Sequence, residues 1–378
     1  MTRAFPKTFV PSRHPRQLQR RSVRYLLMIS VALGIFSPFE ASEAATLPRK
    51  PAFYVVKPAS SAPTLEGTLS DECWKNADVA SAYYEYWKAN PGPGKLPTEF
   101  RMLYSDRGIH LKVTNYDNEA RRARGAITRG DDPELWKDDC AQVYFDPAAK
   151  GIGFANFTVN ILGTRGDMKR LDAAVTIPEW SGDEWVARTT VLDDRWVIEA
   201  FFPWSDLGST AHAGEVWMFD HVRFAWRDEQ LTAVTWAPGG NYANPRFFGY
   251  VYFAGPDKVA YERVAEALHG IATPPWMIPM GEQGEQVLVA KDEKKPDLVS
   301  IPEFIETYRS EMKDRKNRLQ KSGSQLLSPE LENRCETLDK LSPLEAFNRI
   351  NEIVETSREL GDLYWQACIN GLLGNRPK

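Results

Sequence analysis

The chain has 378 residues, which suits two folded units that can each bury a core. It carries 47 Lys and Arg against 51 Asp and Glu, a formal net charge of −4. Phosphate binding depends on clustered basic residues, so this balance speaks against a nucleic-acid partner.

Residues 1–44 differ in character from the rest of the chain. Five arginines within residues 13–24 precede an apolar run over residues 25–36, and small residues follow at Ser42 and Ala44. This order predicts a secretory signal that is cleaved after Ala44, although its arginine pair leaves a twin-arginine route open. The apolar run is shorter than the ~20 residues of a membrane-spanning helix. We therefore expect an exported protein, periplasmic, cell-surface or extracellular, with no integral membrane domain.

Residues 45–60 are expected to be a linker, and the next part of the chain has the pattern of β structure. From Thr64 to Phe253, short alternating runs are separated by turn residues, which favours an antiparallel β-sandwich. Two turn-rich stretches, residues 89–95 and 237–245, are natural positions for a binding rim. The expected strands cover residues 100–104, 108–114, 142–145, 156–161, 185–191, 196–202, 217–226 and 248–253.

After the β region the composition changes. Prolines and a charged stretch indicate an irregular linker over residues 255–300, and apolar residues at helical spacing predict an α-helical domain over residues 301–378. Ser328 and Ser342 each precede a proline, and Glu345 completes a capping box with Ser342. This helical tail is a candidate surface for a protein partner or for self-association.

Four cysteines are present, and an even number in an exported chain permits disulfides. Pairing within each half is the simplest of three full connectivities, and the sequence does not choose among them. The cysteines are Cys73, Cys140, Cys335 and Cys368.

Three ordered segments carry a family resemblance: residues 64–77 (TLEGTLSDECWKNA), 136–146 (WKDDCAQVYFD) and 196–207 (WVIEAFFPWSDL). Over residues 61–254 the chain resembles a family 9 carbohydrate-binding module. The resemblance implies a mainly β, sandwich-type domain that binds a poly- or oligosaccharide without catalysis, in polysaccharide recognition or catabolism. It also implies packing roles for four tryptophans, Trp74, Trp185, Trp196 and Trp204.

The resemblance places candidate binding residues. In family 9 modules a sugar is held between two aromatic side chains, and the matching positions are Trp136 and Tyr242. The family's acidic ligand-binding residue falls on Gln142, its arginine falls near Thr158, and Asn160 keeps an amide nearby. Losing a carboxylate and a guanidinium removes hydrogen bonds worth about 1.5 to 3 kcal/mol each. The ligand can therefore differ from the chain-end glucose or xylose typical of the family.

The resemblance also implies a metal ion. The family binds structural calcium, and this chain has oxygen-rich clusters in which Asp138 and Asp139 are the candidate Ca²⁺ ligands. Their spacing is not that of an EF-hand loop. The histidines are scattered, without the spacing of a zinc site.

Three alternatives stay open. The sandwich is a scaffold or interaction protein that has lost sugar binding, or the chain has glycoside hydrolase activity through carboxylates among Asp138, Asp139, Asp146 and Glu199. In the wider fold group, related sandwiches hold haem. Met102 and His110 would then be its ligands.

Overall fold

A computed structural model describes residues 47–65, 72–88, 91–171, 175–177, 180–239, 244–281 and 285–374. Residues 47–378 form one compact unit. The predicted signal over residues 1–44 lies outside the described residues. Among the described helices, none combines the length and apolar character needed to cross a membrane.

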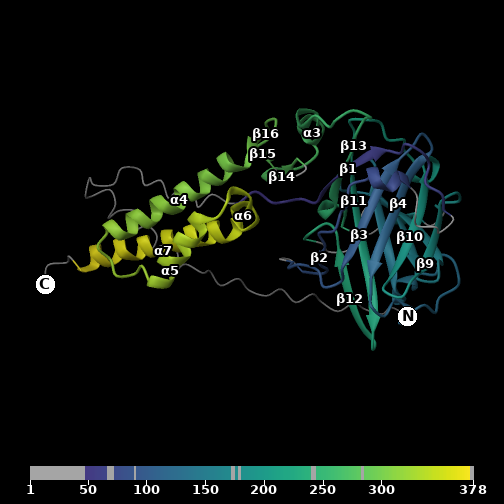
Figure 1. Cartoon of the computed structure of the whole chain (residues 1–378), viewed down its shortest axis with the longest axis horizontal. Coiled ribbons are helices and arrows are strands. Elements are labelled where there is room, and N and C mark those ends of the chain that lie inside the picture. Colours follow the sequence, from purple (N-terminus) through teal and green to yellow (C-terminus); the bar gives the residue numbers. More distant parts are fainter. Residues whose placement is uncertain are drawn as a thin grey trace, which may run out of the picture. The chain divides into compact units, whose positions relative to one another are not determined.

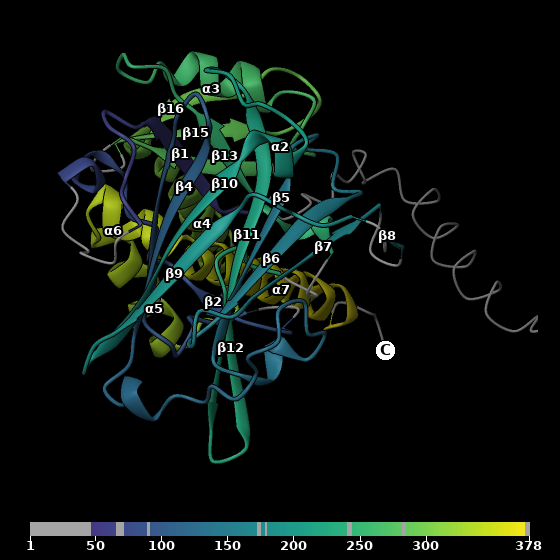
Figure 2. The same cartoon turned by 90° about the vertical axis from the view of Figure 1, so that its right-hand side faces the viewer.

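Thirteen strands of the described residues form one curled sheet (Figures 1 and 2). β1 (Phe53–Pro58) joins its two halves, because residues 53–56 pair with β13 and residues 57–58 pair with β3. Both pairings are parallel, whereas the other described strand pairs of this sheet are antiparallel, so β1 departs from the expected antiparallel arrangement. The linker expected over residues 45–60 is likewise wrong where β1 lies.

The two halves of the curled sheet contain four and eight described strands, with β1 between them. One half contains β3 (Thr98–Tyr104), β4 (Gly108–Tyr116), β9 (Val186–Val191) and β10 (Arg195–Pro203). The other contains β2 (Tyr84–Glu85), β5 (Cys140–Asp146), β6 (Phe154–Asn160), β7 (Arg165–Arg170), β8 (Thr176–Ile177), β11 (Val216–Arg227), β12 (Gln230–Thr235) and β13 (Gly249–Phe253). Each predicted strand coincides with one of these to within two residues at either end.

The two halves face each other across one hydrophobic core, which confirms the sandwich. Phe100 and Phe202 come from one half, and Phe145 and Phe219 come from the other. Phe100 and Phe219 meet with ring centroids 5.4 Å apart. Because side chains alternate along a strand, the remaining positions form the outer faces of the two layers. The predicted packing role is confirmed for Trp74, Trp185 and Trp196, which are buried, and for Trp204, which packs against this core.

Short helical turns connect these strands: η1 (Glu72–Asn76), η2 (Ala120–Arg122), η3 (Leu135–Lys137), α2 (Trp204–Leu207) and η4 (Pro245–Phe247).

A second, three-stranded sheet follows the sandwich, where an irregular linker was expected. Along it, Trp276 and Leu288 pack with α3 and the outer face of the curled sheet, whereas Met277 and Val289 pack with the C-terminal helices. The alternation gives this small sheet two buried faces. The linker prediction for residues 255–300 is therefore wrong. The elements are α3 (Tyr261–Leu268), β14 (Trp276–Met280), β15 (Gln286–Ala290) and β16 (Asp297–Ser300).

The predicted helical tail is confirmed, and α4, α5 and α7 pack alongside one another (Figure 1). Ser328 accepts a hydrogen bond from the Leu331 N–H at 3.1 Å. The capping box also forms, since Ser342 accepts from the Glu345 N–H and the Glu345 carboxylate accepts from the Ser342 N–H. The helices are α4 (Ile301–Lys321), α5 (Pro329–Lys340), α6 (Pro343–Asn348) and α7 (Ile350–Gly374).

The disulfide prediction is wrong, because none of the four cysteines forms a disulfide. Cys73 packs against Leu103 in a small cluster of its own, whereas Cys140 lies in the cluster on the outer face of β5. Cys335 is buried among the C-terminal helices. Three of the four thiols thus serve as small apolar packing groups, with Cys368 half-buried on α7.

Candidate functional site

Trp136 is a surface side chain next to the start of β5. It lies in η3, where its neighbour Leu135 is buried while the Trp136 indole is 38% exposed. The Trp226 ring lies beside it, with centroids 6.1 Å apart and planes at 40°. The Trp226 Nε1–H donates to the Trp136 carbonyl oxygen at 3.1 Å. One indole therefore holds the backbone that presents the other.

Trp226 reaches this position through the alternation of β11. Phe219 belongs to the core between the layers, whereas Phe224, and with it Trp226, points to the outer face. The Asp139 carboxylate accepts from the Trp226 N–H at 3.4 Å, and the Arg124 guanidinium lies 5.3 Å from the centre of the Trp226 ring. The indole is thus fixed at its backbone and covered on one face by a cation.

A third tryptophan extends the aromatic surface. Trp87, in the turn after β2, is 51% exposed and lies 4.6 Å from the Tyr86 ring and 6.1 Å from the Phe224 ring. Because Phe224 and Trp226 share one face of β11, the two exposed tryptophans pack on neighbouring outward residues of that strand. We call this set of rings the aromatic row: Trp136, Trp226, Phe224, Tyr86 and Trp87, of which Phe224 and Tyr86 are buried.

Gln142 lies on the same outer face, within β5. It pairs with Val222 of β11 and Thr158 of β6, and it is 8% exposed. The Tyr144 hydroxyl donates to its Oε1. Its position beside β11 places an amide next to the aromatic row.

Asn160 holds a loop together. Its Nδ2 donates to the Ile127 carbonyl oxygen at 2.8 Å and to the Asp138 carboxylate at 2.9 Å. Its Oδ1 accepts from the Leu162 N–H at 3.1 Å and the Thr164 N–H at 2.8 Å. The amide of this fully buried residue is therefore engaged on both sides by the protein.

The carboxylates of Asp138 and Asp139 are also engaged. Asp138 accepts from the N–H groups of residues 126–127 at 2.8 to 3.0 Å. Asp139 accepts from the Arg124 N–H at 2.8 Å and pairs with Arg227 at 3.0 Å. Burial raises the pKa of Asp139, and these hydrogen bonds and the Arg227 charge oppose that rise.

Within the described ranges, no group of three or more His, Cys, Asp or Glu side chains is arranged to hold a metal ion. Asp146 follows the same pattern, since it accepts from the Ala148 N–H at 3.1 Å and the Gly151 N–H at 2.7 Å. The carboxylates of all three residues thus accept hydrogen bonds from the protein's own backbone.

Residues 65–255, half of the chain, match the family described as carbohydrate family 9 binding domain-like. The chain belongs to this family. No curated protein matches it.

The family 9 domain is also similar to solved structures. A family 9 module from Caldicellulosiruptor kristjanssonii in complex with cellotriose is 14% identical, with a TM-score of 0.41, over 55% of this chain and 95% of that one. Its complex with glucose gives the same identity and TM-score over 98% of that chain. A putative carbohydrate-binding protein from Bacteroides uniformis is 16% identical, with a TM-score of 0.43, over 54% of this chain and 100% of that one.

The binding residues predicted from the sequence of the family 9 domain lie in different environments in the structure. Trp136 and Gln142 lie on the outer face, Asn160 bonds to Asp138, and Tyr242 lies outside the described residues. Sequence reasoning missed Trp226 and Trp87. The alternation of the strand over residues 217–226 would have placed Trp226 outward with Phe224, but nothing local pointed to Trp87.

The proposed haem ligands do not converge. Met102 is buried in the core between the layers, whereas His110 packs on the outer side against Phe201, with ring centroids 4.8 Å apart. Burial lowers the pKa of His110 to about 4. The two side chains project from opposite faces of adjacent strands, which contradicts the haem interpretation.

The carboxylates considered for hydrolysis are dispersed as well. Glu199 lies on β10 of one layer, 3.6 Å from Lys112, and Asp138 and Asp139 lie at the start of β5 in the other. Glycoside hydrolysis needs two carboxyl groups on either side of one bond, and Glu199 does not form such a pair with Asp138 or Asp139.

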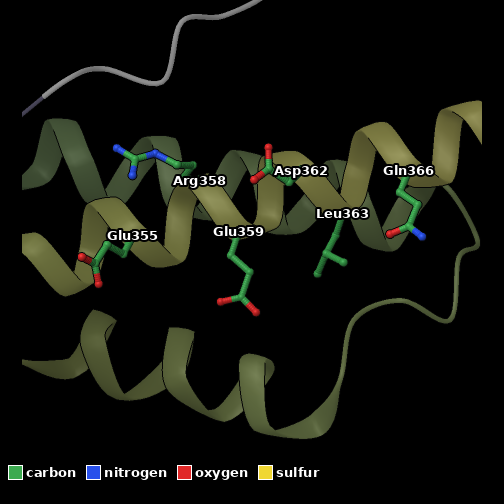
Figure 3. A pocket seen from close by; sticks show the side chains of 6 residues that line it. All are labelled: Glu355, Arg358, Glu359, Asp362, Leu363 and Gln366. Carbon is green, nitrogen blue, oxygen red and sulfur yellow. The ribbon is translucent and has the colours of Figure 1, made fainter.

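One further hollow lies on α7, away from the aromatic row (Figure 3). Glu355, Glu359 and Leu363 project from one side of the helix there, and Glu359 pairs with Arg334 of α5. The lining is charged and holds no aromatic ring, so it lacks the flat apolar surface that a sugar needs. Its residues are Glu355, Arg358, Glu359, Asp362, Leu363 and Gln366.

Proposed function

We propose that this chain is an exported, non-catalytic carbohydrate-binding protein of the family 9 type, acting in polysaccharide recognition or catabolism. The observation that carries the proposal is the pair of adjacent indoles, Trp136 and Trp226, on the outer face of a domain of this family. A pyranose has apolar faces fringed by hydroxyls, and an exposed indole provides the matching flat surface.

Within this proposal, Trp136 stacks on the sugar and Gln142 hydrogen bonds to it. The Gln142 amide can both donate and accept, which suits hydroxyl groups. Tyr242 remains a proposed second aromatic partner from the late loop. Asn160 is assigned to the fold, because its amide already bonds to Asp138 and to three backbone groups.

The remaining parts take supporting roles. Residues 1–44 direct export to the periplasm, cell surface or medium, and the helical tail binds a protein partner or a second copy of the chain. No described feature favours a second activity.

A glycan array with the folded protein and Trp136→Ala tests the proposal, with glucose and cellotriose, the sugars of the two Caldicellulosiruptor complexes, included as probes. Burying an aromatic side chain contributes about 1.5 to 3 kcal/mol, so the variant should lose about ten-fold or more in affinity. Trp365→Ala is the matched control, because Trp365 is 39% exposed on α7 and should leave binding unchanged.

If correctly folded wild-type protein binds no glycan on the array, the result would count against sugar binding and favour the scaffold alternative. Equal binding by Trp136→Ala would instead remove Trp136 from the site.

A further inference from the structure

Trp87 combines a highly exposed side chain with an unusual backbone conformation, and neither is required for packing. Its indole is 51% exposed, and its backbone has a φ of +61°. For a bulky side chain this left-handed conformation is rare and costs of order 1–3 kcal/mol. A strained backbone that presents a large apolar ring to solvent points to a role outside the fold.

The pairing of the strands explains where this ring lies. The Tyr86 N–H donates to the Ala233 carbonyl oxygen at 3.3 Å, and Ala233 is paired with Phe224 across β11 and β12. Trp87 therefore comes from the β12 side and packs over Phe224. Trp136 comes from the β5 side and packs beside Trp226.

Phe224 and Trp226 are two residues apart on one strand, which corresponds to about 7 Å. The two exposed indoles lie over successive outward positions of β11 and on opposite sides of that strand, so their separation exceeds this rise. A ligand that contacts both rings therefore spans more than one sugar residue.

We propose that Trp87 is a second stacking surface and that the aromatic row binds at least two consecutive sugar residues. The inference rests on the proposed function and deepens it, because it assigns a further binding residue, which contacts a sugar beyond the one at Trp136. Trp136 holds one residue, and Trp87 holds a further one.

The charges around the row support a neutral ligand. Arg124, above Trp226, pairs with Glu229 at 3.1 Å, and Lys137, near the Trp136 ring, pairs with Glu134 at 2.5 Å. Each cation beside an indole thus has its own carboxylate. Affinity should accordingly change little between low and high salt, since salt screens exposed charges but not stacking.

Calorimetric titration with glucose, cellobiose and cellotriose, and with the matching xylose series, tests the inference. Wild-type affinity should rise with chain length. Trp87→Ala should lower the affinity for the trisaccharide about ten-fold while leaving the monosaccharide unchanged, and Trp136→Ala should weaken both. Trp87→Tyr keeps a ring over Phe224 and should retain most of the length dependence, whereas Trp365→Ala should have no effect.

The outcomes separate this inference from the proposed function. A length dependence that is the same in wild-type protein and folded Trp87→Ala overturns the role of Trp87 and leaves the proposed function standing. Wild-type protein that binds neither series overturns the inference, and the glycan array then decides whether sugar binding itself fails. Unfolding curves show whether Trp87→Ala loses affinity because it misfolds. If it does, the length dependence of Trp87→Tyr tests the role of Trp87 instead.

Discussion

The Asn160 side-chain amide donates a hydrogen bond to the Asp138 carboxylate at 2.9 Å, and both residues are buried. The bond links the end of β6 to a residue two positions before β5. Asn160 was expected to bind the sugar and Asp138 was expected to bind calcium. In the structure the two side chains bond to each other and to the loop over residues 126–127.

Asp138→Asn should therefore lower stability. The substitution replaces a carboxylate with an amide whose NH₂ group cannot accept from the backbone N–H groups, so we expect a loss of roughly 2 to 4 kcal/mol in the free energy of unfolding. Chemical denaturation measures it. Asp193→Asn makes the same change at a side chain that is 86% exposed and should have little effect. Equal stability of the two variants would show that the Asp138 network is not structural.

Chelation of divalent cations should leave the protein unchanged. The oxygens of Asp138 and Asp139 already accept from N–H groups and from Arg227, so we expect the same melting temperature with calcium and with excess chelator. Differential scanning calorimetry gives the answer. A clear rise in melting temperature on adding calcium would reveal a cation site and contradict this prediction.

Asp220 should make stability depend on pH. Burial raises its pKa from 3.8 to about 7, while hydrogen bonds from Thr235 and Ala237 oppose the rise. Because the folded pKa lies above the unfolded one, its contribution is complete below about pH 4 and is lost as pH rises towards 7, by up to about 4 kcal/mol.

The measurement compares unfolding free energies of wild type and Asp220→Asn from pH 4 to pH 7. The difference between the two proteins should shift steadily across this window in favour of the variant. The comparison is needed because burial lowers the pKa of His221 to about 3, which acts in the opposite direction in both proteins. A difference that stays constant with pH would rule out the shift at Asp220.

Arg223 connects the two layers from a fully buried position. Its Nη1 donates to the Pro97 carbonyl oxygen at 3.0 Å, to Thr98 Oγ1 at 3.3 Å and to the Tyr116 carbonyl oxygen at 3.1 Å. Burial lowers its pKa only to about 10, so it remains charged at neutral pH. Arg223→Met should cost about 3 to 5 kcal/mol in unfolding free energy, because it leaves these buried acceptors without their donor and removes one of the two cations beside Asp117.

Arg223→Lys should not restore that loss, since an ammonium group cannot reproduce the planar set of donors. Arg121→Met, at a 67% exposed side chain, is the control. Denaturation curves in which Arg223→Lys matches wild type would mean that charge alone matters at this position.

Titration with a thiol reagent should find four free thiols per chain in denaturing conditions without reductant. Burial raises the pKa of Cys140 and Cys335, so in the folded protein both should react slowly. Fewer than four thiols in freshly purified protein would indicate a disulfide and contradict the structure.

Local patterns were sufficient for much of the fold. Alternation along residues 196–202 correctly placed Trp196, Ile198 and Phe202 on one buried face, and Ser342 with Glu345 correctly marked a helix start. These features depend on neighbours a few residues away, which the sequence alone displays. The small sheet was missed because prolines and a charged stretch beside its apolar strands are also typical of a linker.

The candidate site depends on pairings between distant segments. Trp136 and Trp226 are 90 residues apart, and Trp87 joins them only because β2 pairs with β12 and β12 pairs with β11. From the residue pattern alone, these positions are recognisable as aromatic residues in or near strands and turns. Their common face follows from strand order and register, which are set by packing across the whole sheet and are visible only once the chain has folded.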